Sequence, residues 1–287
     1  MAPRPLFNFN PDRLPNTAIF LSGSGSNAEK LLQALRTLDK PVLNVAALVT
    51  DAPETSRARE LGRLFSIPVI EHDIRAFYFS RGETRVSIAT PRGQEIREMW
   101  TNELKDKLAP LNLDFGVFAG FVPLTNLTQE LPCLNVHPGD LTYLKDGRRL
   151  LVGLHTIPVE RAIAEGLDYM RSSVILVEPY SGSGGEMDSG YILGISPKVP
   201  IDFMGKDRQA LIDCLAKRPA KRPKAGYGDE MEAVSTYNQN RLKEGGDWIV
   251  LPQTVIAFAQ NRFTAEGKQL YLDGKPGLLN AEAQQEI

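Results

Sequence analysis

The chain has 287 residues and a formal net charge of −2, with 42% hydrophobic and 24% charged residues. This composition excludes wholesale disorder, and the small net charge excludes a global field that would collect nucleic acid or anionic membrane. No apolar run approaches the roughly 20 residues that cross a bilayer, and prolines interrupt the N-terminal segment where a leader would need an apolar stretch. We therefore expect a cytoplasmic protein of one large α/β domain or two small ones.

Short apolar runs alternate with amphipathic segments in the first third of the chain. We expect buried strands at 17–21, 42–49 and 66–70, a helix capped by Asn27, and a second helix near 54–64. Continuous apolar strands separated by helices are typical of a parallel sheet that helices cover. The predicted fold class is therefore α/β, with a Rossmann-like, mostly parallel sheet flanked by helices.

The rest of the chain shows the same alternation of apolar strands and amphipathic helices. A helix is predicted from Pro91 to just before Pro110, because Ile96, Trp100 and Leu104 repeat every four positions on one face. We expect further strands at 113–119, 133–137, 172–178 and 190–195, and further helices near 157–165 and at 252–263, with Pro252 in the first turn and Phe263 on the apolar face.

Two stretches differ from the rest of the chain in composition and in hydrophobic pattern. Residues 73–90 are irregular and residues 203–247 are polar, so we interpret both as insertions in a single domain, 17–287, that follows an N-terminal extension, 1–16. The basic run 217–224 is interrupted by prolines and carries no aromatic residues, so we interpret it as a solvated loop rather than a nucleic-acid site.

The glycine-rich turn Ser22–Asn27 lies where a strand feeds a helix. Glycines let backbone N–H groups approach an anion, and the helix N-terminus favours negative charge, so a phosphate site is predicted. A ligand-free turn is the simpler alternative. A third interpretation is a dinucleotide fingerprint, in which Gly23, Gly25 and Ala28 match G-x-G-x-x-A and Asp51 holds a ribose hydroxyl.

The chain has only three histidines, so each is a candidate catalytic group. Asn135 and His137 lie two apart on one predicted strand and therefore face the same side, where an oxyanion donor and a general base would work together. The simpler alternative for His137 is a buried histidine whose ring is satisfied by backbone hydrogen bonds. Asp188 is either a turn former or the carboxylate that orients a histidine. His72 is expected to be a surface or structural residue, and His155 to cap a helix or contact substrate. No paired metal-ligand spacing is present, and no metal is expected.

Together these motifs resemble the folate-dependent formyltransferases. The resemblance runs from about residue 17 to 277 and rests on SGSGSN, on VFAGFVPL at 117–124, LNVHPGDL at 134–141, GLHT at 153–156 and MDSG at 187–190. It implies the formyltransferase fold, 10-formyltetrahydrofolate as formyl donor, and an amine on a phosphorylated small molecule as acceptor. The acceptor it implies is glycinamide ribonucleotide, of purine synthesis.

The resemblance also implies roles for individual residues. Asn135, His137 and Asp188 would be catalytic. The substrate phosphate would bind at Gly23, Ser24, Gly25, Ser26 and Asn27, and folate would bind at Ala119, Gly120, Phe121, Val122, Leu124, Glu186 and Met187.

The chain departs from the family between H-P and G-L-H-T, where extra residues include Arg148 and Arg149, and the family's D-G-G-P reads Asp188-Ser189-Gly190-Tyr191. Other functions therefore stay open. They are hydrolysis of formyltetrahydrofolate, formylation of an amino-sugar nucleotide whose diphosphate would bind Arg148-Arg149 or 217–224, a dinucleotide-dependent oxidoreductase, and a non-catalytic folate- or phosphate-binding protein. Whether the chain forms a homodimer is also open.

Overall fold

The computed structural model describes residues 2–154, 156–180, 187–220, 222–223 and 226–282. These residues fall into two compact units. The first comprises the chain up to Val136, Ile175–Leu193 and Pro252–Leu278, and the second comprises His137–Val174, Gly194–Leu251 and the chain from Leu279. The single domain at 17–287 and the extension at 1–16 stay predictions.

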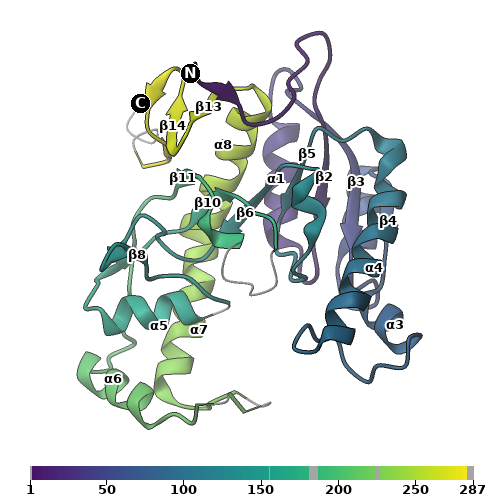
Figure 1. Cartoon of the computed structure of the whole chain (residues 1–287). Coiled ribbons are helices and arrows are strands. Elements are labelled where there is room, and N and C mark those ends of the chain that lie inside the picture. The colour runs from purple at the N-terminus through teal and green to yellow at the C-terminus, as the bar shows by residue number, and fades with distance from the viewer. Residues whose placement is uncertain (1, 155, 181–186, 221, 224–225, 283–287) are drawn as a thin grey trace. The chain divides into compact units, whose positions relative to one another are not determined.

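Five parallel strands follow the apolar runs of the sequence (Figure 1). β2 (Asn16–Phe20) pairs with β3 (Asn44–Thr50) on one side and β5 (Phe115–Phe118) on the other. β4 (Val69–Glu71) continues the sheet beyond β3, and β6 (Cys133–His137) continues it beyond β5. The order of the strands thus reverses between β2 and β5. Parallel sheets bind ligands beside the carboxyl ends of strands at such a reversal.

Among the described residues, eight strands form this sheet, in the order β16-β11-β10-β6-β5-β2-β3-β4. The remaining three are β10 (Ser173–Leu176), β11 (Ile192–Ile195) and β16 (Leu279–Asn280), of which β11 and β16 are parallel to each other. The prediction of a mostly parallel sheet flanked by helices is confirmed. The predicted strands are correct in kind, and their ends differ from the observed ones by at most three residues.

The helices of the first unit bury the apolar faces that the sequence predicts. They are α1 (Ser26–Arg36), α2 (Ala58–Phe65), α3 (Ile74–Phe79) and α4 (Pro91–Leu108), with short 3-10 turns at Ala109–Leu111 and Asn126–Gln129. The α4 stripe of Ile96, Trp100, Leu104 and Leu108 is buried in the core. The irregular stretch 73–90 contains α3, which begins because the Asp73 carboxylate accepts hydrogen bonds from the N–H groups of Arg75 and Ala76.

His72 has a structural role in this core. Its ring stacks on Trp100 with centroids 5.2 Å apart, and its Nε2 lies 2.9 Å from the Trp100 carbonyl oxygen. The Trp100 indole donates in return to the His72 carbonyl at 3.0 Å. The structural interpretation of His72 is therefore confirmed, whereas the surface alternative is wrong because the residue is buried.

The N-terminal residues are part of the first unit's smaller sheet. β1 (Arg4–Pro5) pairs with β13 (Phe263–Glu266), and β14 (Gln269–Leu272) and β15 (Lys275–Pro276) continue this antiparallel sheet. Phe7 is buried and stacks on Phe258 with centroids 5.0 Å apart. Aromatic packing therefore fixes the start of the chain.

The second unit contains a buried helical cluster and two short antiparallel strand pairs. Its helices are α5 (Ile157–Ala164), α6 (Arg208–Lys217) and α7 (Glu230–Leu242), and its strand pairs are β7 (Leu144–Lys145) with β8 (Arg148–Arg149) and β9 (Tyr169–Met170) with β12 (Val199–Pro200). Leu151, Ile163, Leu211, Met231 and Val234 lie in one buried cluster. The polar stretch 203–247 thus contains two helices that contribute to this core.

The final helix differs from the prediction. α7 continues through a π-helical turn at Lys243–Asp247 into α8 (Trp248–Ala259), so Pro252 lies inside a helix rather than in its first turn. A proline inside a helix removes one backbone bond to the residue four positions earlier. Phe263, predicted on the helix face, belongs instead to β13, where it is buried.

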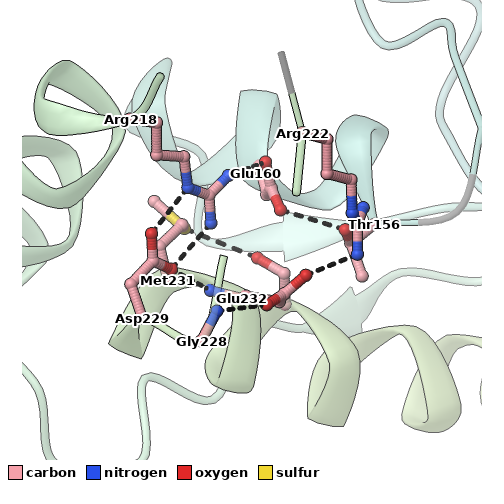
Figure 2. A network of polar contacts seen from close by, with 9 residues as sticks. Thr156, Glu160, Arg218, Arg222, Gly228, Asp229, Met231 and Glu232 are labelled. Atoms are coloured by element: carbon pink, nitrogen blue, oxygen red, sulfur yellow. Dashed lines mark hydrogen bonds and ion pairs between the residues drawn. The ribbon is translucent and has the colours of Figure 1, made fainter. Parts of the chain in front are cut away.

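The basic run 217–224 is exposed at Lys217 and Arg222, as expected of a solvated segment, but Arg218 is an exception. The Arg218 side chain is 8% exposed and donates to both Asp229 oxygens at 2.6 and 2.7 Å and to Glu160 Oε2 at 2.7 Å. Figure 2 shows this guanidinium between the two carboxylates, with Arg222 paired to Glu232 beside it. The acids that follow the basic run therefore neutralise the two arginines, and Arg218 ties α5 to α7.

We predict that Arg218→Met lowers the free energy of unfolding by about 2–4 kcal/mol, because it leaves Glu160 buried without its cation. Arg222→Met removes an exposed pair and should cost about 0–1 kcal/mol. Urea unfolding of both variants at neutral pH measures the difference. Equal effects would show that Arg218 is no more than a surface contact.

The ion pair between Arg218 and Asp229 makes the stability of the fold depend on pH. The Arg218 hydrogen bonds hold the pKa of Asp229 below its usual range. A carboxylate with a depressed pKa stabilises the fold at neutral pH, and this contribution is lost as the pH falls through the native-state pKa. We therefore expect the gap in stability between wild type and Arg218→Met to shrink under acid, below about pH 4.

Candidate functional site

The glycine-rich turn joins β2 to α1 with one difference from the prediction. α1 begins at Ser26 after Gly25, whose φ of 65° is left-handed. A Cβ at Gly25 would lie 2.8 Å from Leu61 and 2.9 Å from Leu21, so this position requires glycine. Asn27, expected to cap the helix, lies in its first turn because the glycine turn itself starts the helix. No side chain caps this N-terminus, so its backbone N–H groups keep the geometry that binds an anion.

Ser22 connects the carboxyl ends of three neighbouring strands. Its Oγ donates to Asp51 Oδ1 at 2.5 Å, just beyond β3, and accepts from the backbone N–H of Val122 at 2.9 Å, beyond β5. Its own N–H donates to the Gly120 carbonyl at 3.1 Å. The structure thus brings the predicted phosphate turn, Asp51 and the predicted folate segment together at the point where the strand order reverses.

The residues of the predicted folate segment have unequal environments. Ala119 is buried, and Phe121 is partly buried against Phe20 and Phe118, with both centroid distances at 5.3 Å. Val122, in contrast, is 57% exposed. Phe121 therefore packs against the core while Val122 presents an apolar surface that a ligand could cover.

A cavity of ≈650 Å³ opens beside this segment in the first unit. Val122 and Leu124 form part of its wall, together with Asp51, Asp73 and Arg97. Its volume lies in the range of small-molecule sites, and it combines apolar walls with a few charged groups, as such sites do.

Arg97 is the functional candidate that sequence reasoning missed. It is 7% exposed, its Nη1 donates to the Leu124 carbonyl at 2.8 Å, and its buried Nε has no hydrogen-bond partner. No described carboxylate lies within ion-pair distance of it. A buried guanidinium that acts on Asp51 without forming a direct ion pair favours an anionic ligand. The signal in the sequence was a second buried stripe on α4, Gly93, Arg97 and Thr101, which repeats every four positions.

Asp51 is buried at the same edge, and burial raises the pKa of its carboxyl above the ordinary value. The hydrogen bond from Ser22 and the nearby charge of Arg97 oppose this shift. A carboxyl with a raised native pKa loses its contribution to stability as the pH rises through that pKa. Asp51 therefore costs stability at neutral pH, as functional carboxylates often do.

Asn135 and His137 lie on β6, and the alternation of side chains along a strand directs both to one side. His137 is 3% exposed, and its Nε2 lies 2.8 Å from the Leu151 carbonyl oxygen. A carbonyl only accepts, so Nε2 carries the proton, and in the neutral imidazole Nδ1 is the basic nitrogen. The backbone thus selects one tautomer of the predicted general base.

Gly139 creates the space for this hydrogen bond. A Cβ there would lie 2.3 Å from the Leu151 carbonyl oxygen and 3.1 Å from His137 Nε2. Such approaches are well inside van der Waals contact, so any side chain would displace the Leu151 carbonyl. The glycine of the H-P-G sequence therefore leaves the room that the Leu151 carbonyl needs to bind the His137 imidazole.

Asp188 lies in the 3-10 turn Met187–Ser189 and is partly buried. Gly190 fixes this turn against β10, because a Cβ there would lie 1.9 Å from the Leu176 carbonyl oxygen. Of the other predicted residues, Glu186 and His155 lie outside the described residues, as does the side chain of Met187. The catalytic grouping of Asp188 with His137 stays a prediction.

Other chemistries have weaker support. Cys133 is fully buried, and burial raises the pKa of its thiol far above the ordinary value, so it is packing rather than a nucleophile. Within the described part of the chain, no group of three histidine, cysteine or acidic side chains could hold a metal ion. The helices described include none with the length and apolarity to cross a membrane.

Known structures resemble this fold over nearly the whole chain. Glycinamide ribonucleotide transformylase 1 from Symbiobacterium toebii aligns with a TM-score of 0.61 and 18% identity, covering 90% of this chain and 94% of its own. Phosphoribosylglycinamide formyltransferase from Coxiella burnetii aligns with a TM-score of 0.58 and 16% identity, covering 93% and 99%. A formyltetrahydrofolate deformylase from Pseudomonas syringae aligns with a TM-score of 0.58 and 14% identity, covering 91% and 66%.

These likenesses confirm that the chain has the formyltransferase fold, as the motifs predicted. At such low identities they establish the fold alone. No protein-family model matches the sequence, and no curated protein matches it. Activity and substrate must therefore be argued from the residues of this chain.

We predict that Gly139→Ala breaks the hydrogen bond between His137 and Leu151. NMR of the ¹⁵N-labelled imidazoles should then show loss of the slowly exchanging Nε2–H signal of His137, with a stability loss of about 1–3 kcal/mol from the overpacking. Gly23→Ala is the matched stability control, since a Cβ there meets no atom within 4 Å. An unchanged His137 signal would contradict the proposed role of Gly139.

We also predict that Asp51→Asn stabilises the protein relative to wild type, and that the gain grows as the pH rises from 4 to 8. The amide keeps an acceptor for Ser22 but removes the buried charge. Thermal unfolding across this pH range measures the effect, with the exposed Asp106→Asn as control. A loss of stability at neutral pH would mean that the Asp51 charge supports the fold.

Proposed function

We propose that the protein transfers a formyl group from 10-formyltetrahydrofolate to the primary amine of a phosphorylated small molecule, and that this acceptor is glycinamide ribonucleotide. The observation that carries the proposal is the pair on β6, where Asn135 and His137 face one side and the Leu151 carbonyl holds the imidazole in the Nε2–H tautomer. This pair lies in the N-x-H-P motif that the family resemblance identifies as catalytic.

The chemistry follows from these two side chains. The amine nitrogen attacks the formyl carbon, and the Asn135 amide donates to the oxyanion that develops, a contribution of about 3–4 kcal/mol for one such donor. His137 accepts the amine proton at Nδ1 and supplies a proton to N10 of the folate as the carbon–N10 bond breaks. The products are the formylated amine and tetrahydrofolate. Asp188 would orient His137 or a relaying water, and stabilise the imidazolium.

Features of the first unit support the two binding steps. The Ser26 end of α1 lacks a side-chain cap, which suits the acceptor phosphate. Val122 and Leu124 line the ≈650 Å³ cavity, in which the buried Nε of Arg97 has no hydrogen-bond partner. Folate carries an apolar benzoyl group and a glutamate, so its glutamate carboxylates would give Arg97 an acceptor.

A two-arm assay tests the proposal. Purified protein is mixed with 10-formyltetrahydrofolate in the presence and absence of glycinamide ribonucleotide, and the products are identified by mass spectrometry. Formylated ribonucleotide formed only when the amine is present supports the proposal. Formate in both arms indicates a hydrolase, and no product in either arm contradicts the proposed reaction.

We predict that Asp188→Asn lowers kcat by about 100-fold or more while the protein stays folded, because the imidazolium loses its charged partner. Arg97→Met should instead raise KM for the folate and leave kcat within a few-fold. Steady-state kinetics and circular dichroism of both variants check this division. Wild-type turnover by Asp188→Asn would exclude the catalytic role of this carboxylate.

A further inference from the structure

The short segment Val122–Leu124, which we call the wall segment, lines the ≈650 Å³ cavity of the first unit. It follows Gly120, whose φ of 87° is left-handed and makes the bend after β5. Phe121, between the bend and the wall segment, packs against Phe20 and Phe118. The wall segment therefore lies beyond the end of β5, and its position depends on contacts other than strand pairing.

Two side chains hold the backbone of the wall segment, one at each end. At its start, the Val122 N–H donates to Ser22 Oγ at 2.9 Å. At its end, the Leu124 carbonyl accepts from Arg97 Nη1 at 2.8 Å. Between them, the ring of Pro123 fixes its own φ and restricts Val122 to extended conformations. The wall segment is therefore held in one backbone conformation before a ligand binds.

The Ser22 hydroxyl also holds a second residue that lines the cavity. Its Oγ donates to Asp51 Oδ1 at 2.5 Å, and Asp51 is part of the cavity lining. An ionised carboxylate only accepts hydrogen bonds, so the Ser22 proton is directed to Asp51 and a lone pair of Oγ is left for the Val122 N–H. Ser22 is not among the described residues that line the cavity. It can therefore act on a ligand only through Asp51 and Val122.

We propose that Ser22 is a positioning residue for the ligand of this cavity, and that its hydroxyl fixes the wall segment against Asp51 without touching the ligand. A preformed wall binds more tightly because less conformational freedom is lost on binding. Without the hydroxyl, the Val122 N–H and the Asp51 carboxylate lose their shared partner. Part of the binding free energy is then spent on ordering the wall segment, so the loss falls on affinity.

This inference rests on the proposed function for the identity of the ligand, which is folate, and not for the contacts of Ser22. The hold on the wall segment can be measured in the free protein. The effect on the ligand is measured separately, by titration with a folate that cannot donate a formyl group.

Amide hydrogen exchange at Val122 tests the hold without a ligand. In Ser22→Ala the Val122 N–H should exchange about tenfold faster or more, and Ser22→Thr, which keeps a hydroxyl, should restore most of the protection. Thr17→Val is the matched control, because it removes the buried bond from Thr17 Oγ1 to the Phe115 carbonyl, 3.0 Å long, between the same two strands. Equal exchange at Val122 in wild type and Ser22→Ala would overturn the hold.

Calorimetric titration with tetrahydrofolate tests the effect on the ligand. Ser22→Ala should weaken binding about tenfold, roughly the effect of releasing the backbone of one residue, and Ser22→Thr should restore most of it. Thr17→Val should keep the wild-type Kd within about twofold, although it also loses a buried hydroxyl bond. Equal affinity of wild type and Ser22→Ala, or an equal loss in Thr17→Val, would overturn the positioning role.

Steady-state kinetics separate positioning from catalysis. Ser22→Ala should raise KM for 10-formyltetrahydrofolate about tenfold and leave kcat within a few-fold, because the lost contact affects binding of the folate and not the reacting groups. A fall in kcat with KM unchanged would overturn the inference. If wild type does not bind tetrahydrofolate, the proposed function and this role of Ser22 fail together, whereas equal binding by wild type and Ser22→Ala makes the role of Ser22 fail alone.

Discussion

The site depends first on the hydroxyl of Ser22. One side chain at the end of β2 donates to Asp51 beyond β3 and accepts from Val122 beyond β5, so three strand ends are joined through a single oxygen. A backbone bond from Ser22 to Gly120 adds a second link. The phosphate turn begins one residue later, and Val122 begins the exposed part of the predicted folate segment. One polar contact at the strand reversal therefore holds the predicted phosphate and folate segments next to each other.

The fold was predictable because burial leaves a regular pattern in the sequence. β6 matches its predicted range, and the α4 stripe of Ile96, Trp100 and Leu104 repeats with the helical period. The errors occur where local rules compete. Pro252 suggested a helix start, but the helix begins earlier and continues through the π-helical turn before Trp248. The run 203–247 was interpreted as an insertion because it is mostly polar, although a few of its residues, such as Leu211 and Met231, are buried and hold its helices in place.

The candidate site was predictable only in part. Asn135 and His137 were recognisable because residues two positions apart on a strand face the same side, and this relation depends on local geometry alone. The contact with the Leu151 carbonyl was not recognisable, because every residue has a backbone carbonyl and the residue type does not show which one accepts a hydrogen bond. Arg97 was missed for a related reason, since a charged residue beside an apolar stripe is usually solvated, and only the structure shows that this guanidinium is buried.

The basic run 217–224 shows why charge along a sequence does not reveal the role of a single cation. Arg218 lies among carboxylates that come from α5 and from the start of α7, so its charge is satisfied within the fold and contributes to stability. Arg222, four residues later, is exposed and pairs with Glu232. Neighbours in sequence thus differ in role because acids that are distant in sequence come close to one of them in the fold.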